Sequence, residues 1–356
     1  MLIERIAVRD FRSYEEAELA LGAGLTIVYG ANGAGKTNLL EALYFGCTAR
    51  SFRTTNERNL VRFGATAARV VLSGGDEDGP HELAVGFAPG ELKRVTSDGA
   101  PVERLADVAH RPLASVFSPD RLELIKGQPG LRRAHLDQFV AALWPARAAT
   151  RRAYHEALAQ RNALIGRVRS GRAPADALAS WNLTLAEPGV ALRDDRAAAT
   201  ARIEEAFGRR AVELGITGVA TVGYRPRSSA QTAEQLAQEL GERLEGDLSR
   251  GYTTHGPHRD ELLFTRDGKE LRAFGSQGEQ RLALLALLLA ERDALAAERQ
   301  RPPLLLLDDV MSELDVLRRE RLAGELRGGG QSVVTATELE HVPGWDADDV
   351  TRIAVP

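Results

Sequence analysis

The first fifty residues combine hydrophobic patterns that belong to different secondary structures. Apolar and polar residues alternate from Ile3 to Phe11, which predicts a strand with one buried face. Residues 25–30, LTIVYG, form a short apolar run that ends in glycine and predicts a second strand. A helical pattern begins near Lys36 and continues through NLLEALYFGC. We therefore expect strand, strand, loop and helix in this order.

The middle of the chain changes from a β-rich to a helical pattern. Residues 66–117 hold short alternating runs separated by Gly, Asp and Pro, which predict strands and turns. Residues 115–118, SVFS, predict a strand that Pro119 ends. Residues 121–212 are rich in Ala, Arg and Leu, with apolar residues at helical spacing. We expect two long helices joined by SGRAPAD, with Pro188 beginning the second helix or kinking it.

The remainder of the chain returns to a mixed pattern. From residue 213, short strands accompany one acidic helix near residues 232–248. The last hundred residues predict a strand, a long apolar helix after FGSQGEQR, the strand PPLLLLDD, a helix over residues 315–327 and the strand QSVVTAT. The whole predicts an α/β protein with a β-rich N-terminal subdomain and an inserted α-helical arm. The predicted segments are residues 1–118, the arm at residues 119–212, and residues 213–356.

Composition limits the class of protein and its expected cellular location. The 356 residues are 44% hydrophobic and 27% charged, as in ordinary globular proteins, with a formal net charge of −4. The single cysteine, Cys47, permits no internal disulfide and is expected to be buried in an intracellular protein. The N-terminus lacks the apolar core of a signal peptide, and no segment reaches the roughly 18 uncharged apolar residues of a membrane span. We expect a cytoplasmic protein with no membrane partner.

Residues 30–37, GANGAGKT, fit the phosphate-binding pattern G-x-x-x-x-G-K-[ST]. The segment follows a predicted strand and begins a predicted helix, so backbone N–H groups and the helix dipole can hold an anion. Lys36 is expected to reach the outer phosphates of ATP, and the Thr37 hydroxyl to bind Mg²⁺. A glycine-rich turn that binds nothing is the alternative.

Two carboxylates that are expected to serve the ATP site follow a predicted buried strand. Residues 304–307 are a continuous leucine run, and Asp308 and Asp309 follow it, where ligands bind in open α/β sheets. Asp308 is expected to orient Mg²⁺ and Asp309 to act as general base on water, unless both are solvated turn residues. Lys36 and Asp308 are 308 − 36 = 272 residues apart, a large insertion that is typical of ATPases of the ABC class.

The octapeptide FGSQGEQR, residues 274–281, has two compatible interpretations. Ser276 and Glu279 have the spacing of a capping box at the start of the apolar helix. In ATPases of the ABC class, a serine-glycine signature opens a helix one strand before the second acidic motif, and Ser276 and Gly278 occupy that place. A capped helix N-terminus can also face phosphate through its free N–H groups.

Several motifs, taken in order, resemble the RecF family of bacterial recombinational-repair ATPases of the ABC/SMC class. The combination of GPHRD with SQGEQR is the most specific part of the resemblance, because many ATPases share the phosphate loop. The matching stretches span nearly the whole chain. They are Asp10–Tyr14, Gly30–Asn38, Leu39–Ala42, Phe117–Asp120, Gly256–Asp260, Ser276–Arg281 and Leu307–Val310, with Ser312–Asp315 in the place of the D-loop.

The resemblance implies an ABC-type P-loop ATPase head and a weak, Mg²⁺-dependent, DNA-stimulated ATPase. ATP would close a homodimeric clamp on DNA, and slow hydrolysis would open it. RecO and RecR would be partners, with RecA loaded at single-strand gaps, in replication, repair and the SOS response. Lys36, Asp308 and Asp309 would be catalytic, with Thr37 and Asp308 on the metal. The implied ATP contacts are Arg12, Ser13, Gly30, Asn32, Gly33, Ala34, Gly35, Lys36, Thr37 and Asn38; the partner's site would receive Ser276, Gln277, Gly278, Glu279 and Asp315.

A basic segment is the candidate DNA surface. Residues 121–172 contain eleven Lys and Arg against three Asp and Glu, an excess of eight that leaves −12 on the remainder (−4 − 8). A solvated helix face is the alternative, and the family resemblance favours DNA. Aromatic residues are only 5% of the chain, so phosphate contacts with duplex or a single-strand/double-strand junction are expected more than base stacking. The candidates are Arg147, Arg151, Arg152, Arg161, Arg167 and Arg169.

Departures from other ATPase classes limit the alternatives. Thr337 stands where transporter ATPases carry a histidine that binds the γ-phosphate. No convincing glutamine for a loop that couples the lobes is found, and Ser118–Asp120 is only a candidate for that loop. Both departures suit slow hydrolysis. A transporter ATPase subunit or an SMC-like structural ATPase are the alternatives, but the second needs far longer heptad segments. His258-Arg259-Asp260 matches a kinase catalytic loop, yet no D-F-G follows. The resemblance instead implies a place near the nucleotide or the signature helix.

Overall fold

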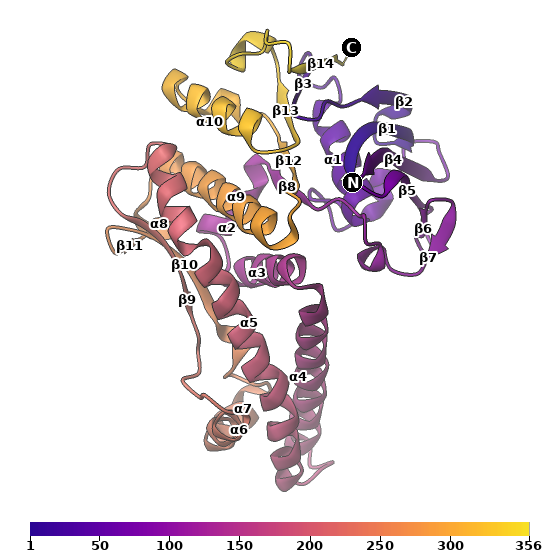
Figure 1. The fold of residues 1–356 in the computed structure, drawn as a ribbon. Helices are drawn as coiled ribbons and strands as arrows, with labels where there is room; N and C mark the ends of the chain where they lie inside the picture. Colours follow the sequence, from indigo (N-terminus) through magenta and orange to yellow (C-terminus); the bar gives the residue numbers. More distant parts are fainter. Residues whose placement is uncertain (356) are drawn as a thin grey trace. The chain divides into compact units, whose positions relative to one another are not determined.

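The computed structural model describes residues 1–355, and the chain divides into two compact units (Figure 1). Unit 1 comprises Met1–Leu122, Glu213–Gly215 and the chain from Leu295 onward. Unit 2 comprises Glu123–Val212 and Ile216–Ala294. Unit 1 is thus built from both ends of the chain, which allows motifs that are distant in sequence to share one core.

Six strands of unit 1 form an antiparallel sheet in the order β2-β1-β4-β5-β6-β7. Ile6 and Val8 of β1 are buried on the same face, because alternate side chains of a strand point to the same side. This sheet is the β-rich N-terminal part that the alternating sequence predicts. The strands are β1 (Leu2–Phe11), β2 (Tyr14–Ala20), β4 (Ala68–Asp76), β5 (Gly79–Phe87), β6 (Arg94–Ser97) and β7 (Ala100–Val102).

Five other strands of unit 1 form a parallel sheet in the order β14-β3-β13-β12-β8. Every residue of β12 is buried, as expected for the leucine run of a strand covered on both faces. The predicted strands before the phosphate loop and before the paired aspartates are therefore confirmed. The strands are β3 (Leu25–Tyr29), β8 (Ala114–Phe117), β12 (Leu304–Leu307), β13 (Ser332–Ala336) and β14 (Thr351–Ala354).

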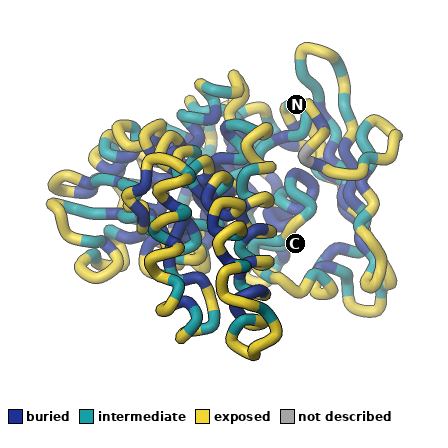
Figure 2. Tube along the Cα trace, turned by 90° about the horizontal axis from the view of Figure 1, so that it is seen from below, coloured by how far each residue is buried: buried dark blue, intermediate teal, exposed yellow. Residues whose placement is uncertain are grey.

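Helix α1 (Lys36–Thr48) links the two sheets of unit 1 into one core. Leu39, Leu43 and Phe45 are fully buried in a cluster that also contains side chains of β1, β4, β12 and β13. Figure 2 shows the resulting stretches of buried chain beside exposed turns. Because α1 is anchored along its length, its N-terminal turn has a defined position at the end of β3. Helix α10 (Val316–Gly328) follows β12 in the same unit.

Unit 2 contains the long helices that the Ala/Arg/Leu-rich segment predicts. Tyr154 and Ala157 of α4 pack with Leu185 and Leu192 of α5, so these two helices form the expected hairpin (Figure 1). A three-stranded antiparallel sheet, in the order β11-β10-β9, completes the unit. The elements are α2 (Glu123–Lys126), α3 (Pro129–Leu143), α4 (Ala148–Arg169), α5 (Leu178–Glu213), β9 (Ala220–Arg225), α6 (Ala233–Glu242), α7 (Leu244–Arg250), β10 (Glu261–Arg266), β11 (Lys269–Glu270), α8 (Leu271–Phe274) and α9 (Gln277–Arg299), whose last residues belong to unit 1.

The structure differs from the predicted helices at two points. Pro188 does not begin the second long helix, because α5 begins at Leu178 and contains the proline. Pro188 therefore leaves one carbonyl of α5 without its helical N–H donor. The acidic helix near residues 232–248 is two helices, α6 and α7, separated at Arg243. The break lets the leucines of α6 and those of α7 enter two different apolar clusters.

The three-segment division at residues 118 and 212 remains a prediction. It rests on composition, whereas the two units follow compactness and divide the chain at other points. Among the described residues, no helix is both long enough and apolar enough to span a membrane.

Candidate functional site

The loop between β3 and α1 has a backbone that requires glycine. Gly30 has φ of 151°, and a Cβ there would lie 2.2 Å from the Val355 carbonyl oxygen. Gly35 has φ of 103°, in the left-handed region that favours glycine. Lys36 begins α1 directly after it, so the first backbone N–H groups of the helix border the loop. This geometry can hold an anion as the sequence predicts.

The Lys36 side chain folds back over this loop. Its Nζ donates hydrogen bonds to the carbonyl oxygens of Gly30 at 2.7 Å and Ala31 at 2.8 Å, and the residue is buried. Both partners are neutral carbonyls, so the loop holds a cation that pairs with no carboxylate among the described residues. An oxyanion bound by the loop would meet this ammonium group.

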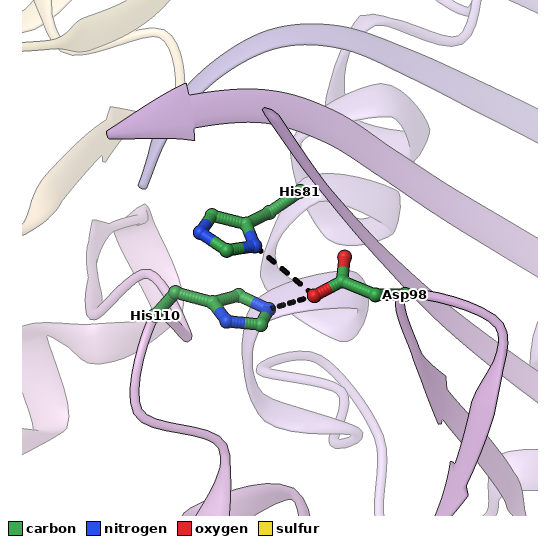
Figure 3. A group of neighbouring side chains, drawn as sticks. All are labelled: His81, Asp98 and His110. Atoms are coloured by element: carbon green, nitrogen blue, oxygen red, sulfur yellow. Dashed lines mark hydrogen bonds and ion pairs between the residues drawn. The ribbon is translucent and has the colours of Figure 1, made fainter. Parts of the chain in front are cut away.

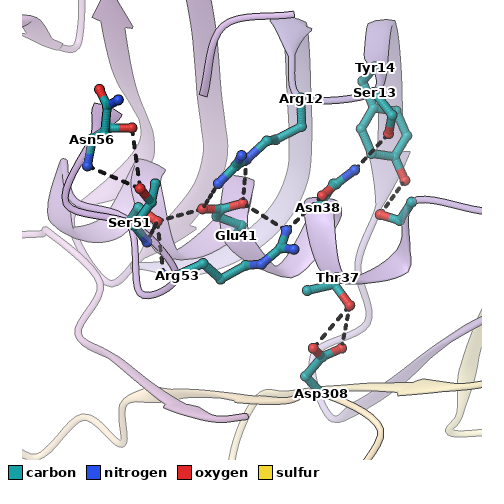
Figure 4. Close-up of polar contacts among 12 residues, drawn as sticks. Arg12, Ser13, Tyr14, Thr37, Asn38, Glu41, Ser51, Arg53, Asn56 and Asp308 are labelled. Atoms are coloured by element: carbon teal, nitrogen blue, oxygen red, sulfur yellow. Dashed lines mark hydrogen bonds and ion pairs between the residues drawn. The ribbon is translucent and has the colours of Figure 1, made fainter. Parts of the chain in front are cut away.

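Thr37 and Asp308 meet at the carboxyl ends of the parallel strands (Figure 4). The Thr37 hydroxyl lies 2.9 Å and 3.0 Å from the two carboxylate oxygens of Asp308, and the Thr335 hydroxyl donates to Oδ1 at 2.9 Å. Burial raises the pKa of Asp308, while hydrogen bonds from Thr335 and Thr37 oppose that rise. A buried carboxylate beside hydroxyl oxygens is a donor set that fits Mg²⁺.

Asp309 has a strained backbone and an exposed side chain. Its φ is +49°, and its N–H donates to Thr335 Oγ1 at 2.8 Å. A non-glycine residue in the left-handed region costs of the order of 1–3 kcal/mol, and such strain persists where other contacts hold it. Here β13 supplies that contact through Thr335. Asp309 is thus open to solvent, whereas Asp308 is buried, and the role of Asp309 as general base remains a prediction.

Arg12 makes a contact that the sequence motif does not predict. Its guanidinium binds the Glu41 carboxylate of α1 through Nε and Nη2, both at 2.8 Å (Figure 4). Glu41 is fully buried and also accepts hydrogen bonds from Ser51 and from Arg53. The expected contact of Arg12 with ATP remains a prediction. Sequence reasoning missed Glu41 as an anchor, although its acidic side chain in the apolar stretch Leu39–Ala42 was a detectable sign.

Ser13 and Asn38 lie together at the same edge of the loop. Asn38 Nδ2 donates to Ser13 Oγ at 2.9 Å, and Tyr14 donates to the Gly35 carbonyl oxygen at 3.2 Å (Figure 4). Ser13 and Tyr14 are therefore attached to the end of the phosphate loop and to the first turn of α1. The structure thus gathers Ser13, Lys36, Thr37, Asn38 and Asp308 into one part of unit 1.

The octapeptide at the start of α9 forms the predicted capping box. Glu279 N–H donates to Ser276 Oγ at 3.3 Å, and Ser276 N–H donates to Glu279 Oε2 at 2.8 Å. Ser276, Gln277 and Gly278 are at least partly exposed, whereas Gln280 is buried and donates to backbone carbonyls of the preceding turn. The cap is confirmed, and the exposed helix start is open to a further molecule.

Asp315 caps another exposed helix start. Its Oδ1 accepts a hydrogen bond from the N–H of Arg318 at 3.0 Å, and Val316 and Leu317 beside it are exposed. Asp315 therefore has a structural role as the cap of α10, and its contact with a partner's ATP remains a prediction.

Comparison with known proteins identifies the family. Residues 2–353 match the family model for the RecF/RecN/SMC N terminal domain. The chain is 40% identical over 354 residues to the DNA replication and repair protein RecF of Anaeromyxobacter sp. (strain Fw109-5), covering 95% of this chain and 93% of that one. It is 37% identical to the RecF protein of Myxococcus xanthus, covering 100% and 96%. The chain belongs to the RecF family.

Solved structures agree with this RecF assignment. A structure described as the recombination mediator protein RecF-ATP in the RecFOR pathway has a TM-score of 0.87 and 28% identity, and covers 95% of this chain and 92% of its own. An Smc head bound to a ScpA domain has a TM-score of 0.58 at 18% identity, covering 95% and 90%. The fold is therefore the ABC/SMC-type ATPase head that the motifs predict.

One of the candidate DNA contacts of this RecF-family chain is wrong. Arg161 is fully buried, binds the Asp247 carboxylate at 2.8 Å and also donates to Asn182 and Thr253. Its position on the inner side of α4 follows from the helical period, since it lies among the buried residues of that helix. Arg161 is a structural cation, and its guanidinium does not face solvent.

The other five candidates remain predictions. Arg152, Arg167 and Arg169 are exposed on α4. Arg151 binds Asp137 at 3.2 Å, and Arg147 binds Asp195 at 2.9 Å and lies over the Trp144 ring. The exposed cations of α4 are therefore the better candidates for phosphate.

His258 is held inside unit 2 of this RecF-family chain. Its Nδ1 lies 2.7 Å from Tyr154 Oη, and its Nε2 lies 2.9 Å from the Thr253 carbonyl oxygen. The second contact requires an N–H on Nε2, and in the neutral ring Nδ1 then accepts from Tyr154. Burial lowers the pKa of His258 to about 4. The histidine therefore has a structural role, and its implied place near the nucleotide or the signature helix remains a prediction.

Proposed function

We propose that this chain binds ATP at Gly30–Thr37 and hydrolyses it slowly as a DNA-repair ATPase. The main observation in support is that the Thr37 hydroxyl contacts the Asp308 carboxylate, while the ammonium of the preceding Lys36 lies on the loop. The solved RecF-ATP relative supports ATP as the ligand. The triphosphate lies against backbone N–H groups of Gly33, Gly35 and Lys36, with the ammonium released from its two carbonyl partners to bind the outer phosphates.

Thr37 and Asp308 are the residues that would hold Mg²⁺. The ion, when bound, neutralises charge that develops on the transferred phosphoryl group. Asp308 is already buried and held by Thr335, so little reorganisation is needed for it to face a cation. Asp309 accepts a proton from water as general base. Thr337 in place of a histidine leaves the γ-phosphate with one ligand fewer, which suits slow turnover.

The proposed assembly is an ATP-dependent homodimer with two composite sites. The exposed start of α9 presents Ser276, Gln277 and Gly278, and Asp315 presents the start of α10. A partner's phosphate accepts hydrogen bonds from the Ser276 hydroxyl and the free N–H groups there. Moving a monomer–dimer balance from 1:99 to 99:1 takes about 5.5 kcal/mol of differential binding. Two such sites, with charge-assisted hydrogen bonds of about 1.5–3 kcal/mol each, supply much of it.

The proposed DNA partner is duplex or a single-strand/double-strand junction. The basic segment at residues 121–172 and its exposed arginines on α4 support this proposal. Likeness to the RecF relatives supports a role in DNA replication and repair. We further propose RecO and RecR as partners and RecA as the protein loaded, as the family resemblance implies. ATP closes the clamp around DNA, DNA stimulates hydrolysis, and loss of the γ-phosphate opens it.

Sedimentation of the full chain tests the dimer. Wild type with ATP and Mg²⁺ is expected to sediment as a dimer, and Ser276→Arg as a monomer that still binds ATP, because the arginine blocks the partner's site. Ser180→Arg, at an exposed serine of α5, is the matched control and should dimerise. Equal ATP-dependent dimerisation of wild type and Ser276→Arg would refute the role of the signature.

A further inference from the structure

Two histidines and an aspartate of unit 1 converge away from the phosphate loop (Figure 3). His81 lies on β5, Asp98 in the turn between β6 and β7, and His110 in the segment that precedes β8. Three stretches of chain that are separated in sequence thus each contribute one side chain with a metal-binding atom. No motif in the sequence predicts this group, because the spacing between its members is irregular.

The three side chains present their ligand atoms to one another. His81 Nδ1 lies 3.0 Å from Asp98 Oδ2, and His110 Nε2 lies 3.9 Å from the same oxygen. The three ligand atoms all lie within 4.8 Å of one another. The two imidazole rings stack with centroids 3.9 Å apart and an angle of 7°. His110 Nε2 also lies 3.1 Å from Ser97 Oγ, a contact that a bound ion would replace. The two stacked imidazoles and the carboxylate form a compact donor set.

Surrounding contacts orient the aspartate and one histidine. Asp98 Oδ1 accepts a hydrogen bond from the Glu82 N–H at 2.7 Å, which leaves Oδ2 toward the histidines. His81 Nε2 lies 3.2 Å from Asp76 Oδ1, and this contact leaves Nδ1 toward Asp98. A metal-binding histidine commonly donates its second N–H to a carboxylate in this way. Asp76 is itself held by Arg301 at 2.8 Å.

We propose that His81 Nδ1, Asp98 Oδ2 and His110 Nε2 bind one Zn²⁺ ion, with water in the remaining position. Two imidazoles and one carboxylate suit a borderline transition metal, whereas Mg²⁺ and Ca²⁺ prefer oxygen ligands alone. Binding replaces the proton shared by His81 and Asp98. Ligand distances of about 2.0–2.2 Å require the rings to tilt from their stack, and the χ2 torsion of histidine is broad enough for that.

Exposure of the three side chains suits a bound ion. His81 and His110 are 15% and 14% exposed, and Asp98 is 45% exposed. The rings are thus fixed by their surroundings, while the carboxylate gives solvent and an ion a route to the group. The competing interpretation is a protonated His81 between Asp76 and Asp98 with no ion. In that case His110 contributes no affinity for metal.

The proposed ion would add a link between parts of unit 1 that already share the apolar cluster of Leu83, Val95, Leu105 and Val108. It ties β5 and the β6–β7 turn to the segment that enters β8. The last residue of β8, Phe117, pairs with Leu307, and its carbonyl accepts the N–H of Asp308 at 2.9 Å. Zinc is therefore expected to raise the melting temperature of the full chain, because it binds the folded state alone.

Zinc titration of the chelator-treated full chain, in excess Mg²⁺ and without ATP, tests the site. We expect one ion per chain and at least tenfold weaker binding in Asp98→Asn and in His110→Gln. Asp98→Asn preserves the contact with the Glu82 N–H and suits the positive φ of 50° at this position, so it keeps the fold. His155→Gln, at an exposed histidine of α4, is the matched control and should bind zinc as wild type does.

Cobalt substitution of the wild-type chain gives an independent result. Co²⁺ should produce visible absorption bands typical of nitrogen and oxygen ligands at low coordination number, and equimolar Zn²⁺ should abolish them. Lys36→Met should retain zinc binding, since the phosphate loop has no part in it. Equal zinc affinity in wild type, Asp98→Asn and His110→Gln would overturn the proposal, as would the absence of zinc binding and of the cobalt bands in the wild-type chain.

Discussion

The hydroxyl of Thr37 lies within hydrogen-bonding distance of both carboxylate oxygens of Asp308, across 271 residues of sequence. The two residues follow strands β3 and β12, which flank β13 in the parallel sheet. Thr335 at the end of β13 binds the same carboxylate, so three strands determine one oxygen-rich site.

Asp308→Asn is expected to abolish Mg²⁺-dependent hydrolysis and to spare ATP binding. The amide keeps the contacts with Thr37 and Thr335 but lacks the charge that attracts the ion, so the rate should fall on the order of 100-fold or more. Thr335→Ser keeps its hydroxyl and is the matched control. Phosphate release measured against Mg²⁺ concentration checks this, and an unchanged rate in Asp308→Asn would contradict the proposed metal site.

Lys36→Met should lose ATP binding. Methionine has a similar length, so the loop keeps its packing, but the ammonium that now binds the Gly30 and Ala31 carbonyls is absent. A charge-assisted hydrogen bond contributes about 1.5–3 kcal/mol, so affinity should fall at least tenfold. Fluorescent-nucleotide titration measures the affinity. If Lys36→Met still dimerises with ATP, the assigned role of the loop is wrong.

Arg161→Met should destabilise unit 2 by about 3–5 kcal/mol, because it leaves the buried Asp247 carboxylate without its partner. Adding Asp247→Asn removes the stranded charge and should recover part of this loss. Chemical denaturation followed by circular dichroism measures both variants. A stability loss below about 1 kcal/mol in Arg161→Met would show that the ion pair is dispensable.

Exposed arginines of α4 should control the salt dependence of DNA binding. Arg167→Gln combined with Arg169→Gln is expected to weaken binding to every DNA sequence and to reduce the slope of log K against log salt by about 0.9 for each phosphate that the variant no longer neutralises. Arg94→Gln combined with Arg104→Gln, on exposed arginines of unit 1, is the matched control. Fluorescence anisotropy of labelled DNA, titrated with each variant at several salt concentrations, measures these slopes. An equal slope in both double variants would move the DNA surface away from this part of α4.

Stability should fall as the pH drops below about 6.5, because burial holds the pKa of His258 to about 4. The folded state then binds fewer protons than the unfolded state, so acid favours unfolding. The loss is about 2 kcal/mol, less than for a fully buried ring because His258 is partly exposed. His258→Gln should have lower stability at pH 7 and a smaller change between pH 7 and pH 4.5. If the unfolding free energies of wild type and His258→Gln change with pH in parallel, His258 is not the cause of the loss of stability in acid.

Local features of this chain could be predicted because short-range physics governs them. The glycines at positions 30 and 35 indicate a backbone that other residues avoid, and the leucine run at 304–307 indicates a doubly covered strand. The capping box of Ser276 and Glu279 needs only three residues of spacing. Their order along the chain was enough to indicate the family.

Contacts between distant segments were decided by the tertiary structure. A basic segment does not distinguish the buried Arg161 from the exposed Arg167, since burial depends on which face of α4 meets α5 and α7. Arg12 binds Glu41 because the turn after β1 lies over α1.

Sequence by itself determined the phosphate loop, the two acidic positions after β12 and the cap of α9, because neighbouring residues impose each of them through backbone conformation or helical period. Tertiary structure alone decided that Thr335 joins Thr37 and Asp308, and that His81, Asp98 and His110 converge. Such encounters depend on which strands become neighbours in each sheet, and that order, which differs from the order along the chain, is not contained in any short stretch of sequence.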